Sequence, residues 1–203
     1  MKIYEFDGFP NPARVRMALA EKGLTDKVEF ISVNVPEGEH RKPEFLAKNP
    51  SGAVPVLELD DGLTISECTA ITEYIDHIDG NPKLTGATPR ARGQIHMMQR
   101  RAEAKLLDAV SDYFHHATPG LGPDLETNQN AEWGERRKLQ AIEGMHYLDG
   151  VLAKQDFIAG DDYSMADITT LAGLAFADFA SIAIPSECTN LTAWRARAAA
   201  RYA

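Results

Sequence analysis

Cysteine is scarce in this chain: its 203 residues include only Cys68 and Cys188. One pair cannot form a disulfide framework, and the two lie too far apart in sequence for a Cys-x-x-Cys redox pair. Long apolar runs are also missing. The opening segment 1–6 is soon interrupted by acidic residues, which a signal peptide would not contain, and no stretch reaches the length of a membrane span. We therefore expect a soluble cytoplasmic protein with reduced thiols and no membrane partner.

Positive charge is in short supply. The chain has 21 Lys and Arg residues against 30 Asp and Glu residues, a formal net charge of −9. Such a chain is a poor non-specific binder of nucleic acid, because that affinity comes mostly from cations that neutralise phosphates. The deficit is concentrated in residues 1–80, which hold 8 basic and 15 acidic side chains. The shares of hydrophobic and charged residues, 44% and 25%, are typical of a folded protein.

The first 80 residues alternate short strand-like and helix-like segments. β-branched and aromatic residues predict strands, and 60–62 (Asp-Asp-Gly) predicts a hairpin turn because Gly adopts positive φ without strain. Apolar residues at helical spacing and a Gly stop signal predict the helices. The strands are expected at 2–6, 28–35, 54–59 and 63–65, and the helices at 12–22, 43–48 and 67–79. This β-α-β-α-β-β-α order favours a mixed α/β domain with an antiparallel edge.

After residue 80 the strand signals stop. Residues 81–88 are rich in Gly and Pro and are predicted to form a linker. Beyond it, apolar side chains recur at helical spacing over 95–113, 139–152 and 168–179. We therefore expect two domains, an α/β domain at 1–80 and an all-α helical bundle at 89–203.

Three motifs in this order resemble those of the cytosolic glutathione transferases. They are Asn-Pro-Ser-Gly-Ala-Val-Pro-Val-Leu at 49–57, Ser-Glu-Cys-Thr-Ala-Ile at 66–71, and the segment 160–167, which ends in Ser-Met-Ala-Asp. The segments 43–49 and 113–123 are similar to a fungal-type branch known from yeast, with bacterial relatives. The resemblance implies a thioredoxin-like N-terminal domain that binds glutathione and an all-α C-terminal domain.

The resemblance also implies a set of glutathione-binding residues. A cis peptide bond between Val54 and Pro55 would present a backbone edge to the cysteinyl residue. Glu67 would pair with the ammonium group, and the N–H groups of the helix beginning there would bind the γ-glutamyl carboxylate. Cys68 stands where the family usually has Ser. His40 or Lys42 would hold the glycyl carboxylate.

Each of these residues also has a purely structural interpretation, and both remain open. Pro55 can simply begin a strand. Glu67 can be a first-turn acid stabilised by the helix dipole, and Cys68 a small apolar residue. His40 and Lys42 can belong to a solvated charged loop.

Activation of the thiol is the catalytic problem, because the thiolate is the nucleophile. Many family members use Tyr, Ser or Cys after the first strand, but here Phe9 occupies that position and has no donor. Asn11 can donate through its amide, as in one bacterial class, or be a turn residue. In the fungal-type branch a Ser in the all-α domain holds a water that relays the proton. The matching residue is Ser111, in a polar stripe over 105–115 that is equally explained as a solvated face.

Phe9, Tyr113 and His115 are candidates to line the electrophile pocket. His115 and His116 do not indicate a metal site, since adjacent helical residues point about 100° apart. Ser164 and Asp167 have the spacing of a capping box, which makes Asp167 a folding residue.

The leading hypothesis is therefore a detoxifying glutathione transferase that conjugates the thiolate to small hydrophobic electrophiles. Glutathione would be a co-substrate, with no further cofactor, and the resemblance implies a homodimer. The absent hydroxyl at Phe9 motivates an alternative, a non-catalytic or weakly catalytic glutathione-binding protein with a regulatory or structural role. A glutathione-dependent reductase is disfavoured, because no cysteine lies near residue 9.

Overall fold

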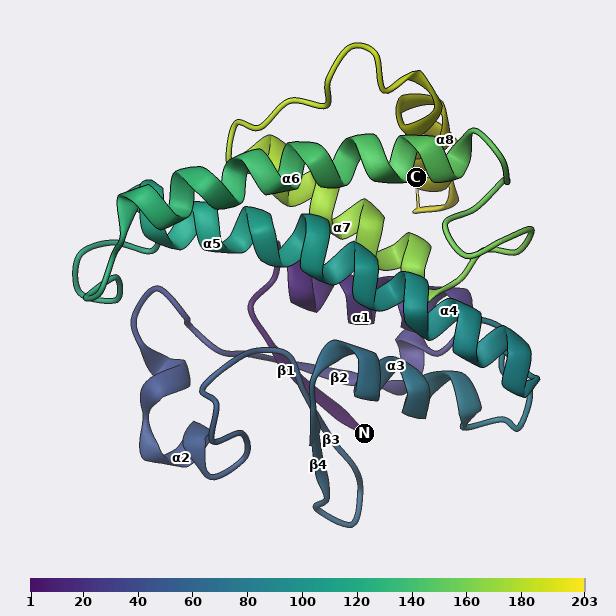
Figure 1. Ribbon diagram of the computed structural model, residues 1–203. Helices are drawn as coiled ribbons and strands as arrows, with labels where there is room; N and C mark the ends of the chain where they lie inside the picture. Colours follow the sequence, from purple (N-terminus) through teal and green to yellow (C-terminus); the bar gives the residue numbers. More distant parts are fainter. Residues whose placement is uncertain (203) are drawn as a thin grey trace. The chain divides into compact units, whose positions relative to one another are not determined.

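The computed structural model describes residues 1–202 of the chain. The chain divides into two compact units, Met1–Pro82 and Lys83–Ala203 (Figure 1). The first unit combines a sheet with helices, and the second is helical. This is the mixed α/β and all-α organisation predicted from the sequence.

The first unit contains a four-stranded sheet in the order β2-β1-β3-β4. Its strands are β1 (Lys2–Glu5), β2 (Glu29–Ser32), β3 (Val56–Glu58) and β4 (Thr64–Ser66). β1 pairs with β2 in parallel, with Ile3 opposite Phe30, and with β3 antiparallel, with Ile3 opposite Leu57. β3 and β4 form the predicted antiparallel hairpin. The helices α1 (Pro10–Glu21), α2 (Pro43–Leu46) and α3 (Cys68–His77) complete the β-α-β-α-β-β-α order, with short 3₁₀ turns at Thr25–Lys27 and Glu39–Arg41.

Both faces of this sheet are covered by helices. The larger core cluster contains Ile3 and Leu57 from the sheet, with Leu19 from α1 and Ile71 from α3. Val56 follows the alternation of a strand to the opposite face, where it packs with Phe45 of α2. Each fully buried aliphatic side chain stabilises the fold by about 1.5–3 kcal/mol.

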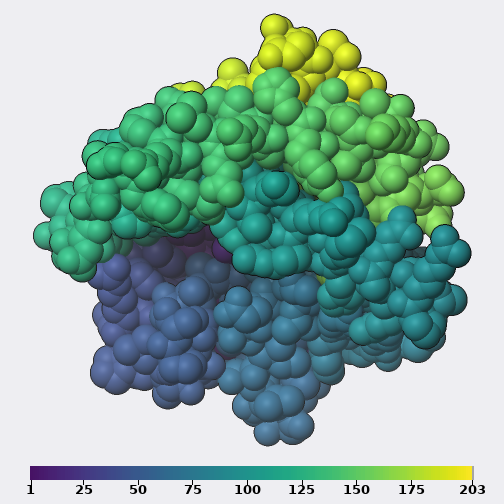
Figure 2. Space-filling model, viewed as in Figure 1, coloured from purple at the N-terminus to yellow at the C-terminus, as the bar shows by residue number. Residues whose placement is uncertain are grey.

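The β3–β4 turn projects from the first unit (Figure 2). Gly62 has φ 89°, and the N–H of Leu59 bonds the carbonyl of Leu63 at 2.9 Å, so the predicted turn is confirmed. Because Gly62 has no Cβ, it adopts this left-handed conformation without strain.

The second unit is built from α4 (Pro89–Ala102), α5 (Asp108–Ala117), α6 (Ala131–Leu152), α7 (Met165–Phe179) and α8 (Thr189–Ala199). The spacing over 95–113 predicts a single helix, but a π-helical segment at Glu103–Leu107 separates α4 from α5. Such a segment accommodates an extra residue within a helix. Among residues 1–202, no helix is both long enough and apolar enough to cross a membrane.

Glycines on α6 and α7 allow close packing around the π segment. A Cβ on Gly144 of α6 would overlap the Lys105 carbonyl oxygen, and one on Gly173 of α7 would lie 3.0 Å from the Leu106 side chain. Glycine is favoured at these two positions because a Cβ would crowd the neighbouring atoms, not because the backbone has an unusual φ.

Candidate active site

The start of α1 carries two of the predicted site residues. Phe9 is the N-cap residue of α1, and its ring packs edge-on against Phe6 with centroids 4.8 Å apart. Asn11 follows in the first turn and is exposed. The Asn11 Oδ1 atom accepts a hydrogen bond at 3.0 Å from Nη1 of Arg14, which is buried. Phe9 offers an apolar surface here and Asn11 a side-chain donor.

The start of α3 lies against this turn. Glu67, the N-cap residue, is exposed and has φ 70°, an uncommon conformation for a residue other than glycine. The next residue, Cys68, is buried, and its Sγ donates to the Asn11 backbone carbonyl at 3.4 Å. The structure thus brings Asn11 and Cys68 together. The first N–H groups of a helix lack intrahelical acceptors, so this end of α3 favours an anionic group.

A second group of predicted residues is brought together by two loops. The Val54–Pro55 peptide bond is cis. Just before it, the buried Asn49 side chain donates to the Ala53 carbonyl at 2.8 Å and fixes the loop. Gly52, with φ 61°, packs so closely that a Cβ there would lie 3.3 Å from the His40 carbonyl oxygen. His40 therefore lies beside the loop that carries Val54.

His40 and Lys42 differ sharply in environment. The His40 side chain is buried, and its Nδ1 has no hydrogen-bond partner within residues 1–202. Burial and the neighbouring Arg41 charge lower the pKa of His40, so the imidazole is neutral near pH 7 and keeps one N–H donor. Lys42 is exposed. A buried polar atom without a partner costs about 1–3 kcal/mol, which a bound ligand or water would offset.

The remaining candidates, Ser111, Tyr113 and His115, lie on α5 in the second unit. Tyr113 lies under the Lys138 ammonium group, 4.8 Å from its ring centroid. His115 Nδ1 lies 2.6 Å from Glu126 Oε1. Ser111 and His115 are one helical turn apart, so they share one face of α5.

Ser111 differs from the polar residues around it. Asp108 pairs with Arg100 at 3.1 Å, and Asp112 pairs with Arg137 at 2.7 Å. The Ser111 hydroxyl, by contrast, makes no hydrogen bond to any side chain or backbone group in the part of the chain that the structure describes, and it is half-buried. It is therefore available to hold a water or ligand.

Arg14 was not among the predicted site residues, although it contacts one of them. The sequence places it three residues after Asn11, and side chains at this spacing meet on one face of a helix. That spacing was the available signal, but it does not show that the guanidinium is buried. The structure adds this fact and the contact to Asn11.

Neither cysteine forms a disulfide, and both are buried. Cys188 Sγ lies 3.4 Å from Nδ1 of His146. Burial raises the pKa of the Cys188 thiol, with smaller contributions from Asp149 and Glu187. The thiol is therefore protonated at neutral pH and is a poor nucleophile.

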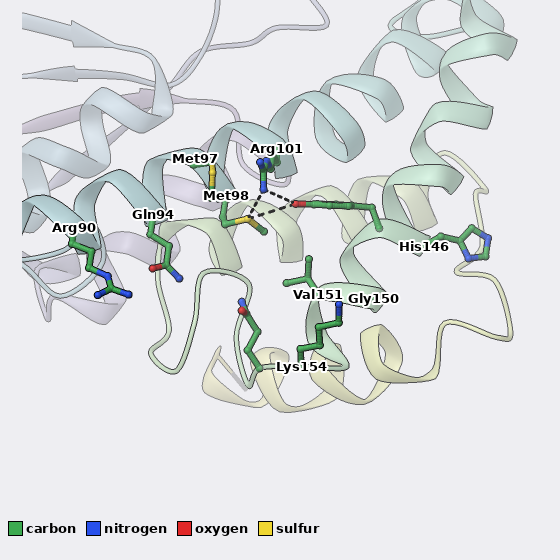
Figure 3. Close-up of a pocket in the computed structure, with 11 residues that line it drawn as sticks. Arg90, Gln94, Met97, Met98, Arg101, His146, Gly150, Val151 and Lys154 are labelled. Carbon is green, nitrogen blue, oxygen red and sulfur yellow. Dashed lines mark hydrogen bonds between the residues drawn. The ribbon is translucent and has the colours of Figure 1, made fainter.

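A separate cleft of ≈ 680 Å³ lies within the second unit, between α4 and α6 and the segment that follows α6 (Figure 3). The described residues that line it include three cations and no Asp or Glu. Arg101 projects toward Met98 and donates to the Tyr147 hydroxyl at 3.0 Å. The lining residues are Arg90, Gln94, Met97, Met98, Arg101, His146, Tyr147, Gly150, Val151, Lys154 and Gln155. The sequence did not predict this surface.

The sheet order, the helix start at Cys68 and the all-α second unit define a glutathione S-transferase fold. A family model described as "Glutathione S-transferase, N-terminal domain" matches residues 10–78, and one described as "Glutathione S-transferase, C-terminal domain" matches residues 109–201. The chain belongs to the glutathione S-transferase family.

Individual relatives narrow the position within the family. The chain is 60% identical to "Glutathione S-transferase 2" of Saccharomyces cerevisiae over 97% of this chain and 84% of that protein. A glutathione S-transferase domain-containing protein from Marinobacter aquaeolei VT8 is 59% identical, with a TM-score of 0.97 over 99% of this chain and 98% of that chain. These matches support the yeast-type branch. Human "Elongation factor 1-gamma" is 33% identical over 66% of this chain and 29% of that protein.

Proposed function

We propose that this enzyme conjugates the glutathione thiolate to small hydrophobic electrophiles, with glutathione as co-substrate and no separate cofactor. The observation that carries the proposal is the start of α3, where the exposed Glu67 and the N-terminal N–H groups of the helix lie beside Asn11. A carboxylate, an ammonium group and a thiol are the groups that such a site would recognise. The 60% identity to a glutathione S-transferase supports the same activity.

In this proposal the first unit binds glutathione at both ends of the tripeptide. The helix start at Cys68 holds the γ-glutamyl carboxylate, and Glu67 pairs with the ammonium group. Val54 and Pro55 present the backbone to the cysteinyl residue. His40, neutral and with an unpartnered ring nitrogen, donates to the glycyl carboxylate, and the exposed Lys42 adds charge attraction.

Two groups are proposed to act on the thiol. The Ser111 hydroxyl holds a water that accepts the thiol proton, and the Asn11 amide donates a hydrogen bond to the thiolate. The thiolate sulfur then forms a bond to the electrophilic carbon, and the leaving group departs with its bonding electron pair. Phe9, Tyr113 and His115 are proposed to contact the electrophile, since such pockets are largely apolar with a few polar groups.

Binding and chemistry are tested separately. Retention on immobilised glutathione measures binding, and release of halide from a dinitrophenyl halide near neutral pH measures conjugation. We expect both. A chain that binds glutathione but conjugates none of several electrophiles would contradict the transferase proposal.

That outcome would support the alternative, a weakly catalytic or non-catalytic glutathione-binding protein. Phe9 favours this alternative, because it places a ring without a donor where the family commonly has a hydroxyl or thiol. The similarity to a protein named "Elongation factor 1-gamma" shows that chains related to this one are not all named as transferases. The conjugation assay separates the two candidates.

We also propose that the chain forms a homodimer in which the cleft between α4 and α6 meets the first unit of a second copy. Charge supports this pairing, since the cleft carries Arg90, Arg101 and Lys154, whereas residues 1–80 hold 8 basic and 15 acidic side chains. Light scattering of Arg101→Glu should report a monomer. Arg136→Glu, on the exposed part of α6 outside the cleft, is the control and should stay dimeric. A dimer that is unaffected by Arg101→Glu would place the interface elsewhere.

A further inference from the structure

Arg14 is a buried cation whose guanidinium contacts the exposed side-chain amide of Asn11. Its side chain is 5% exposed, although it lies on α1 only three residues after the exposed Asn11. Removing a guanidinium from water is costly unless its donors are used. One of them, Nη1, is used on the Asn11 Oδ1 atom at 3.0 Å. The contact therefore links the interior of the first unit to a side chain at its surface.

This contact fixes which way the Asn11 amide faces. A guanidinium has donors only, so the amide atom that meets it must be the oxygen. The Nδ2 group, with its two N–H donors, must then face away from Arg14. An exposed amide held by water alone would sample both orientations, and ordering such a side chain on binding is unfavourable. Arg14 orders it in advance.

The direction in which the Asn11 amide points matters because Asn11 lies beside the start of α3. Its backbone carbonyl accepts from the Cys68 Sγ atom at 3.4 Å, so Asn11 lies at the start of α3. This is the position proposed above for the γ-glutamyl end of glutathione, and the sulfur follows one residue along the tripeptide. Phe9, the predicted site residue two positions before Asn11, offers no side-chain donor. The Asn11 Nδ2 group is thus the side-chain donor at this turn.

We propose that Arg14 is a positioning residue, which holds the Asn11 amide with Nδ2 toward the glutathione sulfur and so lets Asn11 stabilise the thiolate. The guanidinium also polarises the amide, which strengthens the Nδ2 donors. This inference rests on the proposed function, since it requires glutathione bound at the start of α3. Arg14 does not touch the thiol; it acts through Asn11.

The test is the titration of enzyme-bound glutathione, followed by the ultraviolet absorbance of the thiolate. Asn11→Ala and Arg14→Met should each raise the apparent pKa of the bound thiol by about one unit, a roughly tenfold loss of thiolate below that pKa. The double variant should show no larger shift, because both changes remove one interaction. Arg16→Met is the matched control: Arg16 lies on the same helix and pairs with the buried Glu5, so its loss should lower stability without moving the titration.

A second variant guards against misfolding of Arg14→Met. Asn11→Asp changes an exposed side chain, retains an acceptor for Arg14, and replaces the Nδ2 donors with an anionic oxygen. We expect it to raise the pKa of the bound thiol beyond the value in Asn11→Ala. A pKa in Asn11→Asp equal to or below that of Asn11→Ala would overturn the proposed direction of the amide.

Failure of this inference is distinguishable from failure of the proposed function. If Arg14→Met folds and leaves the titration unchanged while Asn11→Ala shifts it, Arg14 is a structural residue only. If neither variant shifts it, Asn11 is a turn residue. In both cases glutathione binding and conjugation persist, so the proposed function stands. A wild-type chain that binds no glutathione would overturn both.

Discussion

The indole Nε1 of Trp194 on α8 donates a hydrogen bond to Oδ1 of Asp167 at the start of α7, at 3.1 Å. Both residues are fully buried. The same carboxylate accepts from the Ile158 N–H at 2.9 Å and from the N–H and hydroxyl of Ser164. With the Ser164 hydroxyl accepting from the Ala166 N–H at 3.3 Å, this completes the predicted capping box. Asp167 thus connects α7, α8 and the segment before α7.

Asp167 should make stability fall as the pH rises through the weakly acidic range. Burial raises its pKa from 3.8 to about 6, against the opposing effect of its hydrogen bonds. Between these values the folded state binds the proton and the unfolded state does not, so the free energy of unfolding decreases with pH and levels off above pH 6. The Asp167 contribution to this decrease is about 3 kcal/mol.

Urea unfolding of the wild type and Asp167→Asn at several pH values between 4 and 7 measures this effect. The variant should be less stable throughout, because an amide Nδ2 would face the Ser164 donors, and the difference between the two proteins should narrow as the pH rises. A difference that does not change with pH would mean that the Asp167 pKa is not raised.

Gly144→Ala should destabilise the second unit. The new Cβ would meet the Lys105 carbonyl oxygen, a backbone atom that cannot move without shifting the π segment. Overpacking of this kind costs about 1–3 kcal/mol. Gly93→Ala is the control, because within residues 1–202 no atom other than those of its chain neighbours and the α4 backbone would lie within 4 Å of an added Cβ. That change should be neutral or stabilising by up to about 1 kcal/mol. Equal effects of the two changes on urea unfolding would contradict the packing argument.

Ser111→Ala should reduce the rate of conjugation while leaving glutathione affinity unchanged. Its hydroxyl is half-buried and makes no hydrogen bond to other groups within residues 1–202, so its removal breaks no contact that supports the fold. Loss of a positioned proton acceptor typically costs about 10²–10⁴-fold in rate. Steady-state kinetics of Ser111→Ala and of the exposed control Ser186→Ala test this. Wild-type turnover by Ser111→Ala would assign activation to Asn11 alone.

His40→Phe should weaken glutathione binding, because the ring nitrogen proposed to bind the glycyl carboxylate is lost. A hydrogen bond to a charged group is worth about 1.5–3 kcal/mol, or roughly a ten- to hundredfold change in affinity. The lowered pKa of His40 adds a second expectation. If His40 bound the glycyl carboxylate as a protonated imidazole, glutathione affinity would fall as the pH rises through 6.5. A neutral imidazole predicts no such fall in affinity. Calorimetry at pH 6 and pH 8 distinguishes the two, and a marked loss of affinity at pH 8 would show that His40 binds as a cation.

The sequence predicted most of the first unit because local signals agree with the fold there. The turn at Gly62 and the helix start at Cys68 are encoded within a few residues. The burial of Arg14 could not be predicted in the same way, since burial of a cation depends on distant packing. α8 was missed for a similar reason: its buried Leu191 and Trp194 lie among Ala and Arg residues, and the Asp167 partner is 27 residues away.

The π segment at Glu103–Leu107 also decides how α5 responds to the loss of a residue. Because a π turn holds one residue more than the surrounding α-helix, deleting a single codon there would restore an unbroken helix. Because the wide turn takes up the extra residue, the side chains beyond the deletion would keep the faces of α5 that they occupy now. Ser111, Tyr113 and His115 would therefore stay on their present faces of the helix. Deletion of one codon early in α5 itself, where no wide turn absorbs the loss, would instead rotate every later side chain by about 100° about the helix axis.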